Sequence, residues 1–126
     1  TGFMLGNDLL IVVGALVGVH QFCKIGESAL LGAGAMVSLD VAPFCNATGD
    51  RATLHGLNLL GLKRRGFDAD TIAVVRRLYR IFFQSSLKTA EAVETARREL
   101  PSVPPVESFL RFVEKAERGL CRESRD

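Results

Sequence analysis

The stretch VGALVGVHQFCKIGESALLGAGAMVSLDVA, residues 13–42, repeats with a period of six. Cut every six residues, it gives VGALVG, VHQFCK, IGESAL, LGAGAM and VSLDVA. The first position always holds a branched aliphatic residue, the fifth holds a small or compact one, and the second is mostly glycine. An amphipathic helix repeats its apolar residues every 3.6 positions and a half-buried strand every 2, so neither explains this pattern.

A six-residue repeat of this kind predicts a triangular β-solenoid whose sides are short strands. We expect the aliphatic residue to fill the core, the small residue to face inward where the wall is tight, and the glycine to permit the turn between sides. Five such repeats make fewer than two coils, and solenoid coils are stable only when stacked on neighbours. The coils therefore need further coils, the rest of this chain or partner chains. The alternative is a glycine- and alanine-rich apolar loop or a buried helix.

Composition describes an ordinary soluble globular protein of 126 residues, with 48% hydrophobic and 24% charged residues. Residues 1–50 carry one basic and four acidic residues, whereas residues 51–126 carry fifteen basic and ten acidic ones. Two structural regimes are therefore expected, changing near residue 50. The net charge of +2 is too small to indicate nucleic-acid binding. The apolar run Leu9–Val19 is too short for a transmembrane helix and lacks the basic flank of a signal peptide.

The three cysteines, Cys23, Cys45 and Cys121, are far apart and odd in number, which argues against a disulfide framework or a zinc site and favours the cytoplasm.

In the second half of the chain, apolar periodicity predicts a helix over 69–84 after an Asp68 N-cap, a second helix after Thr89, and a third from residue 104 that ends near Gly119. We divide the chain into solenoid coils (1–45), a connecting loop (46–67) and a helical domain (68–126).

Two segments go beyond a generic six-residue repeat: VHQFCKIG (19–26) and GLNLLGLKRRGF (56–67). Together they resemble the UDP-N-acetylglucosamine O-acyltransferases, the hexapeptide-repeat enzymes that begin lipid A biosynthesis. The resemblance implies a partial left-handed parallel β-helix followed by a C-terminal helical domain. It also implies a homotrimer with active sites between neighbouring β-helices, and the transfer of a 3-hydroxyacyl chain from acyl carrier protein to the 3-position of UDP-N-acetylglucosamine. It implies no cofactor and no metal.

The resemblance assigns roles residue by residue. His20 and Gln21 match a pair that lines the substrate cleft of the family. Asn58, Arg64 and Arg65 match positions that bind the nucleotide end, and arginine suits a phosphate because its planar fork donates two hydrogen bonds at once. Ala33 lies where the family sets the depth of the groove for the acyl chain.

The match fails at the catalytic base, which the family places on a coil well before VHQFCKIG. The chain holds only His20 and His55, and neither matches that position. We therefore expect the chain to be the C-terminal portion of such an enzyme, with no catalytic residue of its own and no transfer activity in isolation. Leu60 also stands where the family favours an acidic residue, and Phe3 and Met4 replace an expected Gly-His pair.

Other functions remain open at this point. The chain could be a non-catalytic module for trimerisation or for binding acyl carrier protein, with Arg76, Arg77 and Arg80 facing the acidic surface of that partner. It could also belong to the sibling N-acyltransferases, which act later on a 3-amine, although GLNLLGLKRRGF favours the first-step enzymes. A nucleic-acid binder would need a motif that this sequence lacks.

Overall fold

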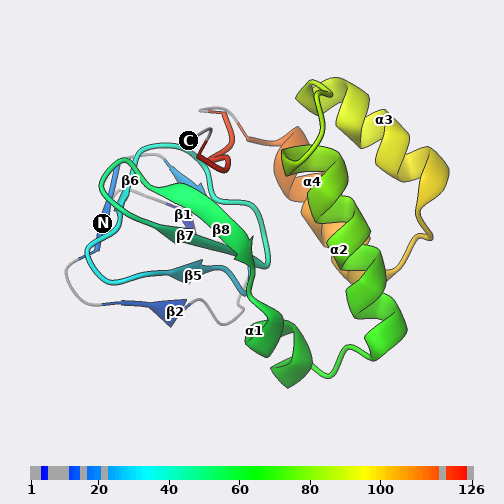
Figure 1. Cartoon of the computed structure of the whole chain (residues 1–126), viewed down its shortest axis with the longest axis horizontal. Helices are drawn as coiled ribbons and strands as arrows, with labels where there is room; N and C mark the ends of the chain where they lie inside the picture. Colours follow the sequence, from blue (N-terminus) through cyan, green and yellow to red (C-terminus); the bar gives the residue numbers. More distant parts are fainter. Residues whose placement is uncertain (1–3, 6–11, 15–16, 21–22, 117–118, 125–126) are drawn as a thin grey trace.

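The computed structural model describes residues 4–5, 12–14, 17–20, 23–116 and 119–124. Short strands lie on one side of the molecule and three longer helices on the other, with a fourth, short helix between them (Figure 1). Within the described residues the order is eight strands followed by four helices. Strands continue to residue 57, so the passage from strands to helices comes after the change in charge near residue 50.

The six-residue period governs the strands. Five of them begin six residues apart, and each is two residues long: β2 (Val12–Val13), β3 (Gly18–Val19), β4 (Lys24–Ile25), β5 (Leu30–Leu31) and β6 (Met36–Val37). β2 pairs with β5 and β3 with β6, in both cases parallel and eighteen residues apart. β1 (Met4–Leu5) pairs with β4 at a separation of twenty. In the β2–β5 and β3–β6 pairs, therefore, three six-residue repeats separate one strand from its partner.

The inward positions of the repeat are buried, as predicted. From Cys23 onward, residues at the first and fifth positions are at most 2% exposed. They are Cys23, Ile25, Ala29, Leu31, Ala35, Val37 and Val41. Small residues thus alternate with larger ones in the interior between the short sides.

The expected role of glycine in the turns is only partly right. Gly26, at the second position of its repeat, is needed for close packing, because a Cβ there would lie 2.7 Å from the Cα of Pro43 in the next layer. The left-handed backbone occurs two positions later in the repeat, at Ser28 (φ 55°) and Gly34 (φ 76°). Only Gly34 there uses the conformational freedom of glycine.

The segment predicted to be a loop is largely ordered into regular elements. β7 (Cys45–Thr48) runs parallel to β5 and pairs antiparallel with β8 (Thr53–Leu57). The short helix α1 (Leu59–Arg64) follows directly. Glycine, asparagine and threonine in this stretch indicated a loop, but pairing with a neighbouring strand supplies backbone hydrogen bonds that local composition does not reveal.

The three predicted helices form close to their expected bounds. α2 spans Ala69–Phe83, with the Asp68 carboxylate accepting from the Thr71 amide as an N-cap. α3 spans Thr89–Glu99 and α4 spans Pro104–Glu114, which ends before the predicted Gly119. Phe82 and Phe109 meet edge to face at 5.0 Å between ring centroids, joining α2 to α4.

The C-terminal tail returns from α4 to the strands (Figure 1) and joins the two regions. Leu120 bridges to Asp40, and Glu123 bridges to Leu54. On the helical side, the Arg122 guanidinium donates to the Phe82 carbonyl at 2.9 Å. The buried apolar side chains form one continuous cluster that includes residues of both regions.

Candidate functional site

A pocket of about 180 Å³ lies where the turn between β4 and β5 meets α1. Ser28 and Leu30 form one wall, and the residues of the other wall come from α1 and its two caps. These are Asn58, Leu60, Gly61, Arg64 and Arg65. The structure thus brings together the three residues that the sequence assigned to the nucleotide end of a substrate.

Asn58 fixes the start of α1 to the turn. Its Oδ1 accepts from the Gly61 amide at 3.0 Å, which makes it the N-cap of the helix, and its Nδ2 donates to the Ser28 carbonyl at 2.9 Å. Asn58 is only 7% exposed. A Cβ at Gly61 would collide with the Asn58 amide, so the glycine is required for this arrangement. Asn58 therefore holds α1 against the turn and forms part of the pocket lining.

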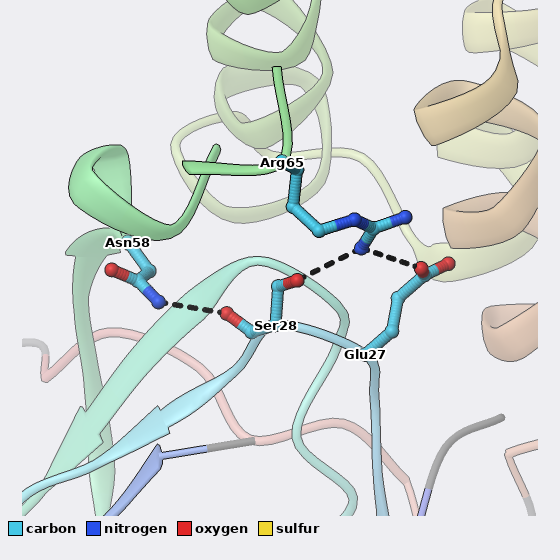
Figure 2. Close-up of polar contacts among 4 residues, drawn as sticks. All are labelled: Glu27, Ser28, Asn58 and Arg65. Atoms are coloured by element: carbon cyan, nitrogen blue, oxygen red, sulfur yellow. Dashed lines mark hydrogen bonds and ion pairs between the residues drawn. The ribbon is translucent and has the colours of Figure 1, made fainter. Parts of the chain in front are cut away.

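Arg65 is held against the same turn, as Figure 2 shows. Its Nη1 donates to Glu27 Oε2 at 2.8 Å and to Ser28 Oγ at 2.9 Å. Glu27 is 8% exposed, so this ion pair is shielded from solvent on the carboxylate side. The Arg65 guanidinium also lies 5.3 Å from the centre of the Phe67 ring. Arg65 thus forms one wall of the pocket and is held there by hydrogen bonds to Glu27 and Ser28.

Arg64 differs from Arg65 although the two are adjacent. It belongs to the last turn of α1, is exposed, and lines the pocket. Among the ion pairs formed by the described residues, none includes Arg64. The pocket therefore offers one uncompensated guanidinium beside two leucines, Leu30 and Leu60. Such a site suits an anionic group attached to a body that can pack against apolar side chains.

His20 lies in a different place, a shallow groove of about 350 Å³. The groove runs along β3 and β6 and also includes Asp50 and Arg51. His20 is exposed, and its backbone amide donates to the Val37 carbonyl at 2.7 Å. Within one chain the groove and the Arg64 pocket have no lining residue in common. Gln21, predicted to act with His20, lies outside the described residues.

Ala33, predicted to set the depth of an acyl groove, is exposed in the turn between β5 and β6. A Cβ at Gly14 would lie 2.6 Å from its amide nitrogen, so the two turns are stacked tightly. Ala33 lines neither the Arg64 pocket nor the His20 groove.

The arginines of α2 form a third polar region. Arg76 and Arg80, with His55, Tyr79 and Gln84, line a surface cleft of about 360 Å³. The Tyr79 hydroxyl accepts from the Gly56 amide at 3.0 Å and donates to Glu123 at 2.7 Å. Burial and the Glu123 hydrogen bond raise the pKa of the Tyr79 phenol. Tyr79 is thus a neutral structural link, and the cleft owes its positive charge to the two arginines.

Sequence reasoning missed Glu27 and Ser28. Both stand in the repeat IGESAL, where only the aliphatic, glycine and alanine positions follow the pattern. A carboxylate in a nearly apolar stretch was the available signal, but its partner lies 38 residues further along the chain. In the described part of the chain, no group of three or more His, Cys, Asp or Glu residues could hold a metal ion, and no helix there is long and apolar enough to cross a membrane.

Comparison with known proteins gives consistent results. Residues 40–121 match the profile of the family described as UDP N-acetylglucosamine O-acyltransferase, domain 2. The acyl-[acyl-carrier-protein]–UDP-N-acetylglucosamine O-acyltransferase of Myxococcus xanthus is 40% identical over 112 residues, which are 89% of this chain and 43% of that protein. The chain therefore spans less than half the length of this relative.

Solved structures agree. The UDP-N-acetylglucosamine acyltransferase of Bacteroides fragilis superposes with a TM-score of 0.89 at 32% identity, over 95% of this chain and 46% of that one. The Arabidopsis enzyme of the same name superposes with a TM-score of 0.75 at 34% identity, over 94% of this chain and 48% of that one. The similarity covers both the strands and the helices.

Proposed function

Since this chain belongs to the UDP-N-acetylglucosamine O-acyltransferase family, we propose that it serves the transfer of a 3-hydroxyacyl chain from acyl carrier protein to UDP-N-acetylglucosamine. Its part in that reaction is to bind the sugar nucleotide. The observation that carries this proposal is Arg64, an exposed guanidinium beside Leu30 and Leu60 in the pocket at α1. A diphosphate supplies the matching negative charge, and the nucleoside supplies an apolar face.

In this proposal the candidate site residues have different roles. Arg64 contacts the diphosphate, and Asn58 and Arg65 hold the walls of the pocket. His20, which is exposed in its groove, contacts the substrate, and Gln21 acts with it. Ala33 limits the depth of the acyl groove. The His20 groove and the Arg64 pocket are separate within one chain, which suits a site completed by a neighbouring copy.

The fold that we propose is the family's left-handed parallel β-helix, built on the coils of 1–45 and continued by the 46–67 segment and the helical domain of 68–126. The pairing of strands eighteen residues apart supports it, because three six-residue sides return the chain to the same face. We propose a homotrimer in the cytoplasm. Exposed Met36 and Leu39, 42% and 40% accessible, are available for contact between copies.

These 126 residues lack the family's catalytic base in our proposal. His20 stands at a position that contacts substrate, and His55 is an exposed residue of β8 whose Nε2 lies 3.2 Å from Thr53 Oγ1. Deprotonation of the sugar hydroxyl requires a base within hydrogen-bond reach of it. We expect the isolated chain to bind UDP-N-acetylglucosamine without transferring an acyl group. Normal turnover in an assay with acyl carrier protein and radiolabelled sugar nucleotide would overturn this expectation.

Native mass spectrometry with UDP-N-acetylglucosamine tests the binding proposal. We expect up to one ligand per chain, and loss of binding by about ten- to a hundredfold in Arg64→Ala, the range for a hydrogen bond to a charged group. Arg77→Ala is the matched control, because Arg77 is also exposed but lies on α2, outside the pocket. Equal affinities for the two variants would refute the assignment.

One observation favours a second candidate function, an acyl-carrier-protein binding module without catalysis. Arg76, Arg77 and Arg80 are exposed on α2, and no ion pair between described residues includes them. A basic helix of this kind attracts an acidic partner, and the attraction weakens with salt. This candidate would be favoured if the chain binds acyl carrier protein in a salt-sensitive way and does not bind the sugar nucleotide.

A further inference from the structure

The Arg64 pocket is lined by two adjacent arginines, and only one of them is paired with a carboxylate. Arg65 lines the pocket, yet its Nη1 is bonded both to Glu27 and to Ser28. Arg64 lines the same pocket and takes part in no ion pair between described residues. The difference between the two arises from Glu27.

Glu27 is well placed to have this effect. Its carboxylate is almost fully buried, with 10% of the side chain exposed, whereas the Arg65 side chain remains 27% exposed. A buried carboxylate needs a counter-charge, since an unpaired charge is costly in a poorly solvated site. The turn that carries Glu27 is itself held in place, because the Ser28 carbonyl accepts from the Asn58 amide (Figure 2).

We infer that Glu27 is a positioning residue that holds the Arg65 guanidinium at the wall of the pocket and neutralises its charge, so that Arg64 supplies the uncompensated charge that meets an anionic ligand. This inference rests on the function proposed above and adds a residue to it. It has an unusual consequence. Removal of the Glu27 charge releases a second guanidinium into the pocket, so binding of a diphosphate becomes tighter, whereas loss of a merely structural ion pair would leave binding unchanged or weaken it.

Glu27→Gln tests this consequence, because glutamine keeps the size of the side chain and removes its charge. Isothermal titration with UDP-N-acetylglucosamine should show affinity about three- to tenfold higher than in the parent chain, the range of one partly exposed charge contact. The gain should disappear when the comparison is repeated in an Arg65→Ala background. Glu99→Gln is the matched control, since Glu99 is an exposed acid whose removal changes the net charge equally.

Arginine modification by phenylglyoxal, followed by peptide mass spectrometry, tests the same contact without a ligand. In the parent chain Arg64 should react and Arg65 should be protected, and in Glu27→Gln both should react. Unchanged or weaker binding by Glu27→Gln would overturn the inference, and so would a gain that persists without Arg65 or equal reactivity of the two arginines in the parent. If the parent shows the expected reactivity but does not bind the sugar nucleotide, the proposed function fails and the Glu27–Arg65 contact stands.

Discussion

Asn58 offers the sharpest test of how the pocket is built. In Asn58→Ala, α1 loses its N-cap acceptor, which is worth about 1 kcal/mol at a typical helix start. The Ser28 carbonyl also loses the amide that donates to it at 2.9 Å in a buried position. An acceptor left buried without its partner costs about 1–3 kcal/mol. The free energy of unfolding should therefore fall by about 2–4 kcal/mol in total.

For a chain of this length that loss corresponds to a decrease in Tm of about 8–16 °C. Urea unfolding followed by circular dichroism at 222 nm measures the free energy directly. Asn46→Ala is the matched control. Asn46 Nδ2 makes a longer bond to the Leu57 carbonyl, 3.3 Å, and its buried Oδ1 has no hydrogen-bond partner among the described residues. Asn46→Ala should lower the free energy of unfolding by less than about 1 kcal/mol, because the substitution removes an unsatisfied acceptor as well as the hydrogen bond.

Equal destabilisation by the two alanine variants would refute the reasoning, since it would show that the bonds of Asn58 contribute no more than those of an asparagine with one unsatisfied atom. A loss below about 1 kcal/mol in Asn58→Ala would do the same, because the N-cap alone accounts for that much.

Three further predictions concern packing, specificity and reactivity. Gly26→Ala should lower the free energy of unfolding by about 2 kcal/mol or more, because the new Cβ would press on the backbone of Pro43; a stability equal to that of the parent in urea would contradict this. Leu60→Glu should leave stability within about 0.5 kcal/mol, since Leu60 is 58% exposed, and should strengthen binding of UDP-N-acetylglucosamine, because the family favours an acidic residue at this position; weaker binding in a titration would contradict this. Burial raises the pKa of the Cys121 thiol to about 11 and that of Cys45 further, so both should resist a thiol reagent at pH 8 until urea is added; rapid labelling of the native chain would contradict their burial.

Much of the fold could be predicted because its signals are local. A six-residue period requires only that the same face of each short strand point inward, and the buried residues from Cys23 to Val41 follow it. The helix α2 likewise begins where Asp68 can cap it, and its apolar face follows from spacing alone. The β7–β8 hairpin was not predictable in this way, because β7 pairs with β5 at a separation of sixteen residues, which departs from the eighteen-residue spacing of the repeat.

The candidate site, too, was predictable where its signals are local and not where they depend on distant residues. The residue types of GLNLLGLKRRGF and VHQFCKIG were sufficient to indicate the family and to select Asn58, Arg64 and Arg65. They could not distinguish between two neighbouring arginines, because that distinction depends on a carboxylate 38 residues away from Arg65.

The sequence by itself therefore determined the period of the strands, the positions of the three long helices and the family. The strands and the helices depend on spacing within a few turns or strands, where backbone geometry alone decides which side chains share a face. The family follows from the resemblance of two short segments. Only the tertiary structure decided that Asn58 and Arg65 point inward to the Glu27–Ser28 turn while Arg64 points to the pocket. The physical reason is that buried polar groups must be satisfied by whichever partners the folded chain brings near, and those partners are distant in sequence.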